Sequence, residues 1–250
     1  MEDLQLLIDL HQGTIHQGPG SEATTLKAFG LTGLDPNAHL TIGDFGCGTG
    51  SAAIALAHHL PNATIQSVDL CTEFIDVLQQ QIQKHQLTDR LFTFTDSIDN
   101  LPFTEESFDL IWSEGAIYNI GFEAGLKYWR RFLRDRGLIA VSEITWLTAT
   151  RPTAIDEYWQ NEYPEIDTAA NKLSVIQRQG FSPIAFFVLS PDCWLEHYYE
   201  PLEQGFSEFL ERHDHSDQAQ TLLANQQQEI ALYRTYQAYF SYGFYIAQKM

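Results

Sequence analysis

The chain has 250 residues, and its 33 Asp and Glu residues against 14 Lys and Arg residues give a formal net charge of −19. Hydrophobic residues make up 44% of the chain and aromatic residues 13%, which is enough for a sizeable core and excludes a wholly disordered protein. The acidic balance argues against a protein that grips nucleic-acid phosphates through clustered basic residues, so we expect no nucleic-acid partner.

The cysteine content and the first residues bear on the cellular compartment. Cys47, Cys71 and Cys193 are too few for a disulfide framework and form no CxxC pair, which favours a reducing compartment. The opening MEDLQLLIDLHQG carries acids where a signal peptide needs positive charge. No apolar run approaches the roughly 20 residues that cross a bilayer. We therefore predict a cytoplasmic protein with no membrane partner.

Strand-like and helix-like patterns alternate along the chain. The predicted strands are 39–45, 63–70, 91–95, 107–113, 137–147, 181–190 and 242–250. The predicted helices are 49–60, 73–87, 122–134, 165–179, about 194–212 and 216–240. Strands joined by helices imply βαβ crossovers, so the pattern predicts an α/β fold with a mostly parallel sheet and helices on both faces.

The chain shows no internal repeat and no linker rich in Pro or Gly, so we predict a single domain over residues 1–250. Its core would comprise about 39–190 and 242–250. Residues 1–38 would form an N-terminal lid, and 191–240 would be a helical insertion.

A glycine-rich turn, DFGCGTG from Asp44 to Gly50, lies directly between a predicted strand and a predicted helix. Gly46 and Gly48 permit a tight turn with positive φ and a close approach of a ligand to the backbone. The N–H groups at the start of the helix favour an anionic ligand group such as a carboxylate. The dinucleotide fingerprint G-x-G-x-x-G fails because Ser51 occupies the last glycine position, which disfavours an NAD-linked oxidoreductase.

An acid follows at the end of the next predicted strand. Asp69 lies 19 residues after Gly50, and a carboxylate there can accept hydrogen bonds from both ribose hydroxyls of a nucleoside. The alternative is that Asp69 caps the helix that begins near Glu73.

Three segments resemble one enzyme family. The D-x-G-x-G-x-G form of 44–50 resembles motif I of the class I S-adenosylmethionine (SAM)-dependent methyltransferases. TDSIDNLPF at 95–103 is similar to the D-x-x-x-LPF stretch of that family, and FDLIWSEGAIYNI at 108–120 to its fourth strand and following loop. The resemblance covers roughly 40–147 and implies a Rossmann-like, seven-stranded sheet whose last strand is antiparallel. One departure is Arg136-Gly137, where many relatives have Pro-Gly-Gly.

The resemblance implies SAM as the cofactor, S-adenosylhomocysteine as the product and a small-molecule methyl acceptor, and it leaves a homodimer open. In the family, the acid after the third strand and the next residue meet the adenine edge, which here means Asp96 and Ser97. The full implied cofactor site is Asp44, Gly46, Gly48, Asp69, Leu70, Asp96, Ser97, Ile98, Ser113 and Glu114. GPGSEATTLKAF at 18–29 resembles a lid segment of some small-molecule methyltransferases, or is a surface connector ahead of a helix.

No residue is identified as catalytic from the sequence. Because the methyl group of a sulfonium is already activated, the protein must mainly orient the nucleophile, and only an alcohol, phenol or amine needs a base. The candidates are Tyr118, Glu143 and His197, of which His197 is also read as an ordinary surface or core histidine. With no clear base, the alternative function is a non-catalytic SAM- or nucleotide-binding regulatory module. His213-Asp214-His215 has the spacing of a metal chelate, but in a polar loop it favours a solvated segment, and we expect no metal.

Overall fold

The computed structural model describes residues 2–250, and their side chains from residue 4 onward. Its strands form one sheet in the order β3-β2-β1-β4-β5-β8-β7, with β6 paired to the end of β5. The strands are β1 Thr41–Phe45, β2 Thr64–Asp69, β3 Leu91–Thr95, β4 Phe108–Glu114, β5 Leu133–Trp146, β6 Asp167–Thr168, β7 Phe181–Val188 and β8 Phe240–Lys249. β8 runs antiparallel to both β5 and β7, and every other pair is parallel. The predicted fold class is confirmed, with the two-residue β6 as an addition.

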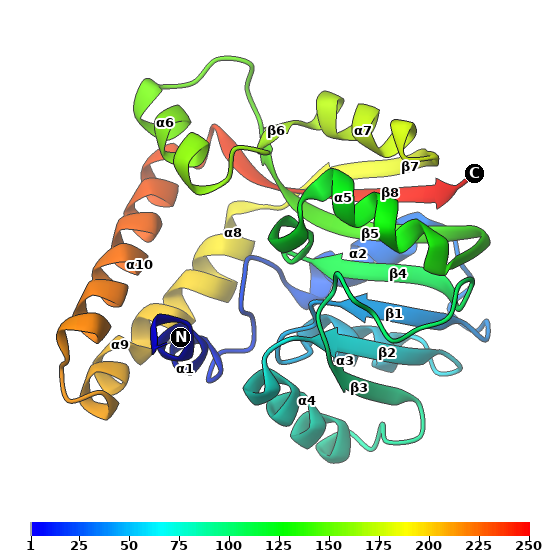
Figure 1. Cartoon of the computed structure of the whole chain (residues 1–250), viewed down its shortest axis with the longest axis horizontal. Coiled ribbons are helices and arrows are strands. Elements are labelled where there is room, and N and C mark those ends of the chain that lie inside the picture. The colour runs from blue at the N-terminus through cyan, green and yellow to red at the C-terminus, as the bar shows by residue number, and fades with distance from the viewer. Residues whose placement is uncertain (1) are drawn as a thin grey trace.

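Helices surround this sheet (Figure 1). The α-helices are α1 Glu2–His11, α2 Glu22–Thr32, α3 Ser51–His59, α4 Thr72–Lys84, α5 Phe122–Trp129, α6 Thr153–Glu162, α7 Ala169–Arg178, α8 Pro191–Trp194, α9 Glu200–Arg212 and α10 Asp217–Tyr236. The short helices are η1 Ile117–Ile120, η2 Arg130–Phe132 and the π-helical turn η3 Leu195–Tyr199. Side-chain caps set three of the starts, because Ser21 accepts from Thr24 N, Thr168 from Asn171 N and Ser216 from Ala219 N.

The two faces of the sheet bury separate apolar cores. α2, α3 and α4 cover one face, where Ile42 of β1 packs against Leu56 and Leu78. α5 and α7 cover the other face, to which β1 contributes Phe45. Both Ile42 and Phe45 are fully buried. Side chains alternate between the faces of a strand, so the nearly continuous burial of β1 reflects cover on both sides of the sheet.

A helical lobe made of α1, α8, α9 and α10 lies beyond the carboxyl ends of the parallel strands (Figure 1). An ion pair between Arg212 Nη2 and Asp9 Oδ2, 2.9 Å apart, joins α9 to α1. In open α/β sheets, ligands bind at the carboxyl ends of the strands. The lobe therefore stands over the edge of the sheet at which a ligand is expected.

Some element boundaries differ from those predicted. The helix predicted over 122–134 ends at Trp129, because Leu133 already pairs with Phe108 as the first residue of β5. The helix predicted from 194 begins at Pro191 and is interrupted by η3. The helix predicted from 165 begins at Ala169, since 167–168 join the sheet as β6. α6 was not predicted.

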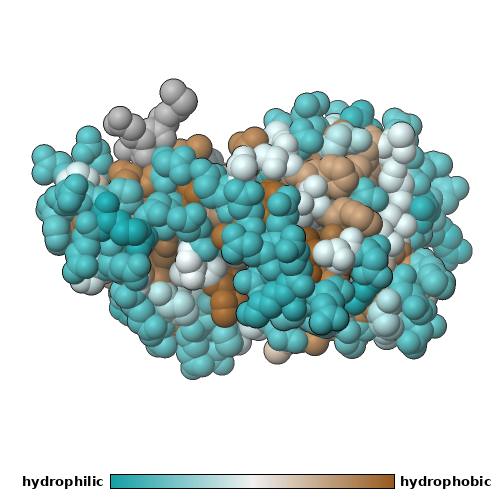
Figure 2. Space-filling view, turned by 90° about the horizontal axis from the view of Figure 1, so that it is seen from below, coloured by the Kyte–Doolittle hydropathy of each residue, from teal (hydrophilic) through white to brown (hydrophobic). Residues whose placement is uncertain are grey.

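The face seen from below is mostly hydrophilic, with apolar patches of limited extent (Figure 2). This pattern agrees with the acidic composition of the chain. Within residues 2–250, no helix combines the length and apolarity that crossing a membrane requires.

Candidate active site

The glycine-rich turn follows β1 and precedes α3. Gly46, Gly48 and Gly50 adopt φ values of 77°, 54° and 88°, the left-handed region that favours glycine. A Cβ atom at Gly46 would overlap the side chain of Ala116, and one at Gly50 would overlap Leu78. Any larger residue at these two positions would force the turn away from its neighbours, so the local geometry accounts for the glycines.

Backbone N–H groups of the turn bind the end of β2. The amides of Gly46 and Cys47 donate to the Val68 carbonyl at 2.8 and 3.0 Å. Gly48 N donates to Asp69 Oδ2 at 2.8 Å. The turn is thereby held in a fixed position beside the carboxylate that ends β2.

Asp69 retains capacity to bind a ligand. Its Oδ1 accepts from Cys71 N at 2.9 Å, so each carboxylate oxygen has one N–H donor and at least one further lone pair. Asp96 N donates to the Asp69 carbonyl at 3.1 Å, which places the two acids on adjacent strand ends. Burial raises the pKa of Asp69, while the N–H groups of Cys71 and Gly48 act in the opposite direction. A half-buried, partly satisfied carboxylate here suits two ribose hydroxyls.

Two further carboxyl groups lie next to Asp69. Asp44 is 1% exposed, and its Oδ2 has no hydrogen-bond partner in the described part of the chain. Glu114 Oε1 accepts from Thr25 Oγ1 at 2.7 Å and from Trp112 Nε1 at 2.9 Å. Burial raises the pKa of Asp44 well above its usual range, and the nearby Glu114 and Asp69 raise it further. None of these three carboxyls forms an ion pair with any residue of 2–250, so the site fits a ligand that carries positive charge.

The other predicted cofactor residues differ in how deeply they are buried. Ser113 is fully buried, and its Oγ donates to the Phe45 carbonyl at 2.7 Å, so this hydroxyl joins β4 to β1. Ile98 is buried at 8% exposure, whereas Leu70 is 64% exposed beside the site. Ser97 is half-buried at the start of the loop after β3. Any contact from Ser113 to a ligand would come from its backbone.

Residues 14–20 lie against the glycine-rich turn, a contact that the sequence did not reveal. Gln17 Oε1 accepts from Thr49 N at 2.9 Å and lies 3.0 Å from Thr49 Oγ1. Gln17 Nε2 donates to the Thr14 carbonyl at 2.9 Å. His16 Nδ1 lies 3.2 Å from Ser51 Oγ, and burial, followed by the nearby ring of His197, lowers the pKa of His16 to about 4. The only sequence signal was the Gly-Pro-Gly segment that follows.

Four tyrosines and one glutamate from η1, η3, α10 and β8 form a further group. We call Tyr118, Tyr198, Tyr199, Tyr242 and Glu229 the tyrosine cluster. Tyr199 Oη donates to Glu229 Oε1 at 2.9 Å, and the rings of Tyr198 and Tyr199 are 4.9 Å apart. Of the five, only Tyr118, Tyr198 and Tyr199 stand near motifs that the sequence analysis singled out. Glu229 and Tyr242 come from α10 and β8 and carried no signal.

Glu143 forms a buried ion pair. Its side chain is fully buried, and its Oε1 lies 2.9 Å from Lys172 Nζ, itself 3% exposed. Burial raises the pKa of Glu143, and Lys172 opposes that rise. Glu143 Oε2 and the hydroxyl of Tyr163 are both buried, and burial followed by the nearby Glu143 carboxylate raises the pKa of Tyr163. Among the catalytic candidates, Tyr118 and His197 are exposed, and Glu143 is enclosed beneath the site.

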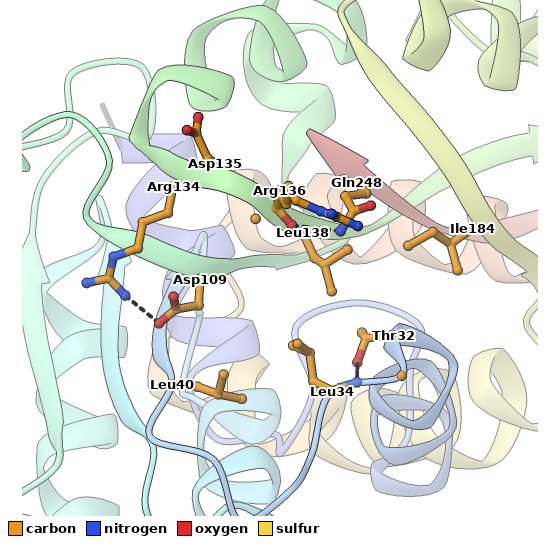
Figure 3. Close-up of a pocket in the computed structure, with 12 residues that line it drawn as sticks. Thr32, Leu34, Leu40, Asp109, Arg134, Asp135, Arg136, Leu138, Ile184 and Gln248 are labelled. Atoms are coloured by element: carbon orange, nitrogen blue, oxygen red, sulfur yellow. Dashed lines mark hydrogen bonds and ion pairs between the residues drawn. The ribbon is translucent and has the colours of Figure 1, made fainter. Parts of the chain in front are cut away.

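A pocket of about 330 Å³ lies elsewhere, at the amino ends of the parallel strands (Figure 3). Arg134 Nη1 and Asp109 Oδ2, 2.5 Å apart, form an ion pair at its wall. None of the predicted site residues lines this pocket. Its place at the edge opposite the glycine-rich turn gives no reason to connect it with that site.

Comparison with known proteins bears on this geometry. Residues 42–137 match the profile of a family described as a methyltransferase domain. The chain is 30% identical over 113 residues to the methyltransferase GfsG of Streptomyces halstedii, covering 44% of this chain and 40% of that protein. It is 29% identical over 115 residues to a demethylmenaquinone methyltransferase of Porphyromonas gingivalis, covering 45% and 46%. The chain thus spans less than half the length of these curated relatives.

Solved structures are similar over nearly the whole chain. A SAM-dependent methyltransferase of Geobacter sulfurreducens, in complex with S-adenosylhomocysteine, superposes with a TM-score of 0.85 at 14% identity, covering 98% of each chain. A SAM-dependent methyltransferase of Thiobacillus denitrificans, in the same kind of complex, gives 0.83 at 14% identity, covering 99% of this chain and 98% of that one. At this identity the likeness establishes the fold alone.

Proposed function

We propose that this chain, a member of the class I SAM-dependent methyltransferases, transfers a methyl group from SAM to a small-molecule acceptor and releases S-adenosylhomocysteine. The observation that carries the proposal is the set of acids at successive strand ends around the glycine-rich turn. Asp44, Asp69 and Asp96 stand at or just after the carboxyl ends of β1, β2 and β3.

Each of these acids has a distinct part in binding the cofactor. Asp69 accepts the ribose hydroxyls through the lone pairs that its two N–H donors leave free. Asp96 and Ser97 meet the adenine edge, with Ile98 as an apolar contact for the ring. Glu114 and the unpartnered oxygen of Asp44 provide negative charge close to the turn.

When bound, SAM supplies an activated methyl group on a positively charged sulfur. What this chain must then contribute is the position of the acceptor and the exclusion of water. The helical lobe and residues 14–20 close the carboxyl edge of the sheet over the turn (Figure 1). Cover of this kind over the glycine-rich turn favours a small acceptor over a large polymer.

The cofactor assignment is tested by calorimetric titration of the protein with S-adenosylhomocysteine. Asp69→Ala removes two charge-assisted hydrogen bonds, so we expect affinity to fall at least tenfold, or about 1.4 kcal/mol. Asp76→Ala, which removes an exposed acid on α4, is the matched control and should bind like the parent. Equal affinity in all three proteins would contradict the ribose assignment.

A non-catalytic SAM-binding module is the second candidate function. It is favoured by one observation: Glu143, the carboxylate among the sequence-derived candidates, is enclosed and already paired with Lys172. The two functions differ in turnover. Methylated product from SAM and a panel of small metabolites would support the enzyme and exclude the module.

A further inference from the structure

The tyrosine cluster is assembled from four elements that are distant in the sequence. Tyr118 lies in η1, Tyr198 and Tyr199 in η3, Glu229 in α10 and Tyr242 in β8. No part of the cofactor assignment uses these side chains. The rings of Tyr199 and Tyr242 both contact Trp194, with centroids 5.9 and 5.3 Å from the centroid of that ring. Tyr199 also donates to Glu229, which joins the glutamate to the same group of rings.

The cluster adjoins the predicted cofactor site. Tyr242 Oη is 3.6 Å from the position that a Cβ atom of Gly115 would take. Gly115 directly follows Glu114, at the carboxyl end of β4. Trp194 stacks on Tyr242 with ring centroids 5.3 Å apart, which fixes the plane of the tyrosine ring. A molecule held against Tyr242 would therefore lie next to the carboxyl ends of the central strands.

Tyr118 is both accessible and surrounded by protein. It is 42% exposed, and yet burial among neighbouring groups raises the pKa of its hydroxyl. Tyr242 and Glu229 are likewise neither fully buried nor exposed. Solvent therefore reaches all three side chains, so each is accessible to a ligand.

The carboxyl group of Glu229 has no cationic partner within residues 2–250. Burial raises its pKa, so a cation bound beside it would favour its charged form. Glu229 accepts from Tyr199 Oη but forms no ion pair with any residue of 2–250. The other nearby carboxylate, Glu143, has Lys172 as its partner, and Glu162 on α6 adds further negative charge toward Glu229. Tyrosine rings present a negative face that attracts cations. An anionic ligand would be repelled here, and a neutral one would leave the charge of Glu229 unpaired.

We propose that the tyrosine cluster binds the methyl acceptor and that this acceptor is an amine, held as its ammonium ion between the tyrosine rings and Glu229. This inference rests on the proposed methyltransferase function. In the reaction, Glu229 takes one ammonium proton and so frees the nitrogen lone pair. The nitrogen then bonds to the methyl carbon as the carbon–sulfur bond breaks, and that electron pair stays on sulfur. The sulfonium charge passes to the methylated nitrogen, so charge and atoms balance.

Binding of matched probes tests the charge requirement. We would titrate the protein loaded with S-adenosylhomocysteine with choline, with its neutral isostere 3,3-dimethyl-1-butanol and with the anion 3,3-dimethylbutyrate. The cluster predicts that choline binds at least tenfold more tightly than either isostere, because only choline gains cation–π and ionic contacts. Equal binding by choline and the alcohol, or preference for the anion, overturns the inference.

Substitutions in the tyrosine cluster test whether choline binds there. Glu229→Gln keeps the shape of the side chain and should remove most of the preference for choline, whereas Glu211→Gln, an exposed acid on α9, should leave it unchanged. Tyr118→Phe keeps the aromatic face and should retain choline binding, while Tyr118→Leu should weaken it severalfold. A preference for choline that survives Glu229→Gln and Tyr118→Leu places the cation elsewhere and refutes the assignment.

Measurements of turnover and of cofactor binding distinguish a failure of the acceptor assignment from a failure of the proposed function. If S-adenosylhomocysteine binds but only alcohols, thiols or acids are methylated, the acceptor class is wrong and the proposed function stands. If S-adenosylhomocysteine does not bind at all, the proposed function fails and this inference fails with it. Methylation of primary or secondary amines, inhibited competitively by choline, is the expected result.

Discussion

Neutralising Asp44 should stabilise the ligand-free protein. Asp44 is 1% exposed, one of its oxygens has no hydrogen-bond partner, and Glu114 and Asp69 place like charge beside it. Leaving a buried polar group unsatisfied costs about 1–3 kcal/mol, and more when it is charged. Asp44→Asn keeps the shape and removes the charge, so we expect a gain of about 1–2 kcal/mol near pH 8. For a chain of this size that corresponds to a rise in Tm of roughly 2–8 °C.

The gain should depend on pH in a definite direction. The pKa of Asp44 in the folded protein lies above its value in the unfolded chain, so between these two values the folded state binds more protons than the unfolded state. The contribution of Asp44 to the free energy of unfolding therefore falls as pH rises through that window. Since Asn does not titrate, the advantage of Asp44→Asn over the parent should grow with rising pH and shrink in acid.

The assay is thermal and urea unfolding of parent and variant at several pH values between about 5 and 8, without cofactor. Asp76→Asn, the same change at an exposed position on α4, is the control and should stay within about 0.5 kcal/mol of the parent. A variant less stable than the parent at pH 8, or an advantage that does not change with pH, would refute the view of Asp44 as a buried, uncompensated carboxyl.

Two further predictions concern stability alone. Gly50→Ala should destabilise the protein by about 2 kcal/mol or more, because the new Cβ would overlap Leu78 and the backbone φ is positive. Gly33→Ala also places Cβ at a positive φ but in open space, so it should cost only about 1 kcal/mol. Chemical denaturation of both variants compares the two free energies of unfolding directly. Lys172→Met should lower the free energy of unfolding by about 3–5 kcal/mol, because it leaves Glu143 buried without a partner. Adding Glu143→Leu should recover most of that loss. A double variant as unstable as the single one would contradict the ion-pair argument.

The parts of the fold that were predictable have a local cause. The turn at 44–50 lies between a buried strand and a helix, and both its glycines and its neighbouring acid are visible in a short window of sequence. The antiparallel last strand was expected from the resemblance, and the structure confirms it. Boundaries such as the end of α5 depend instead on the pairing of Leu133 with Phe108, 25 residues away, which no local pattern reports.

The acceptor side of the site was not predictable for the same reason. Glu229 lies in a helix whose neighbouring Gln run reads as a solvated face, and Tyr242 lies in a strand whose aromatic residues suit a core. Their proximity to Tyr118 arises only when the helical lobe packs over the sheet. The contact of Gln17 with Thr49 is a further case, since a single glutamine ahead of a glycine segment carries no signal in sequence.

The position of β8 has a consequence for the order in which the sheet can be completed during synthesis. Within residues 2–250, β7 has β8 as its only sheet neighbour, and β8 also pairs with β5, about a hundred residues earlier. Until residues 240–249 leave the ribosome, β5 presents an open edge and β7 cannot dock. Such long-range closure slows folding and exposes an unpaired strand to other chains. A nascent protein of this topology thus passes through an interval in which the unpaired edges of β5 and β7 are exposed, and chaperones that cover such edges would act mainly then.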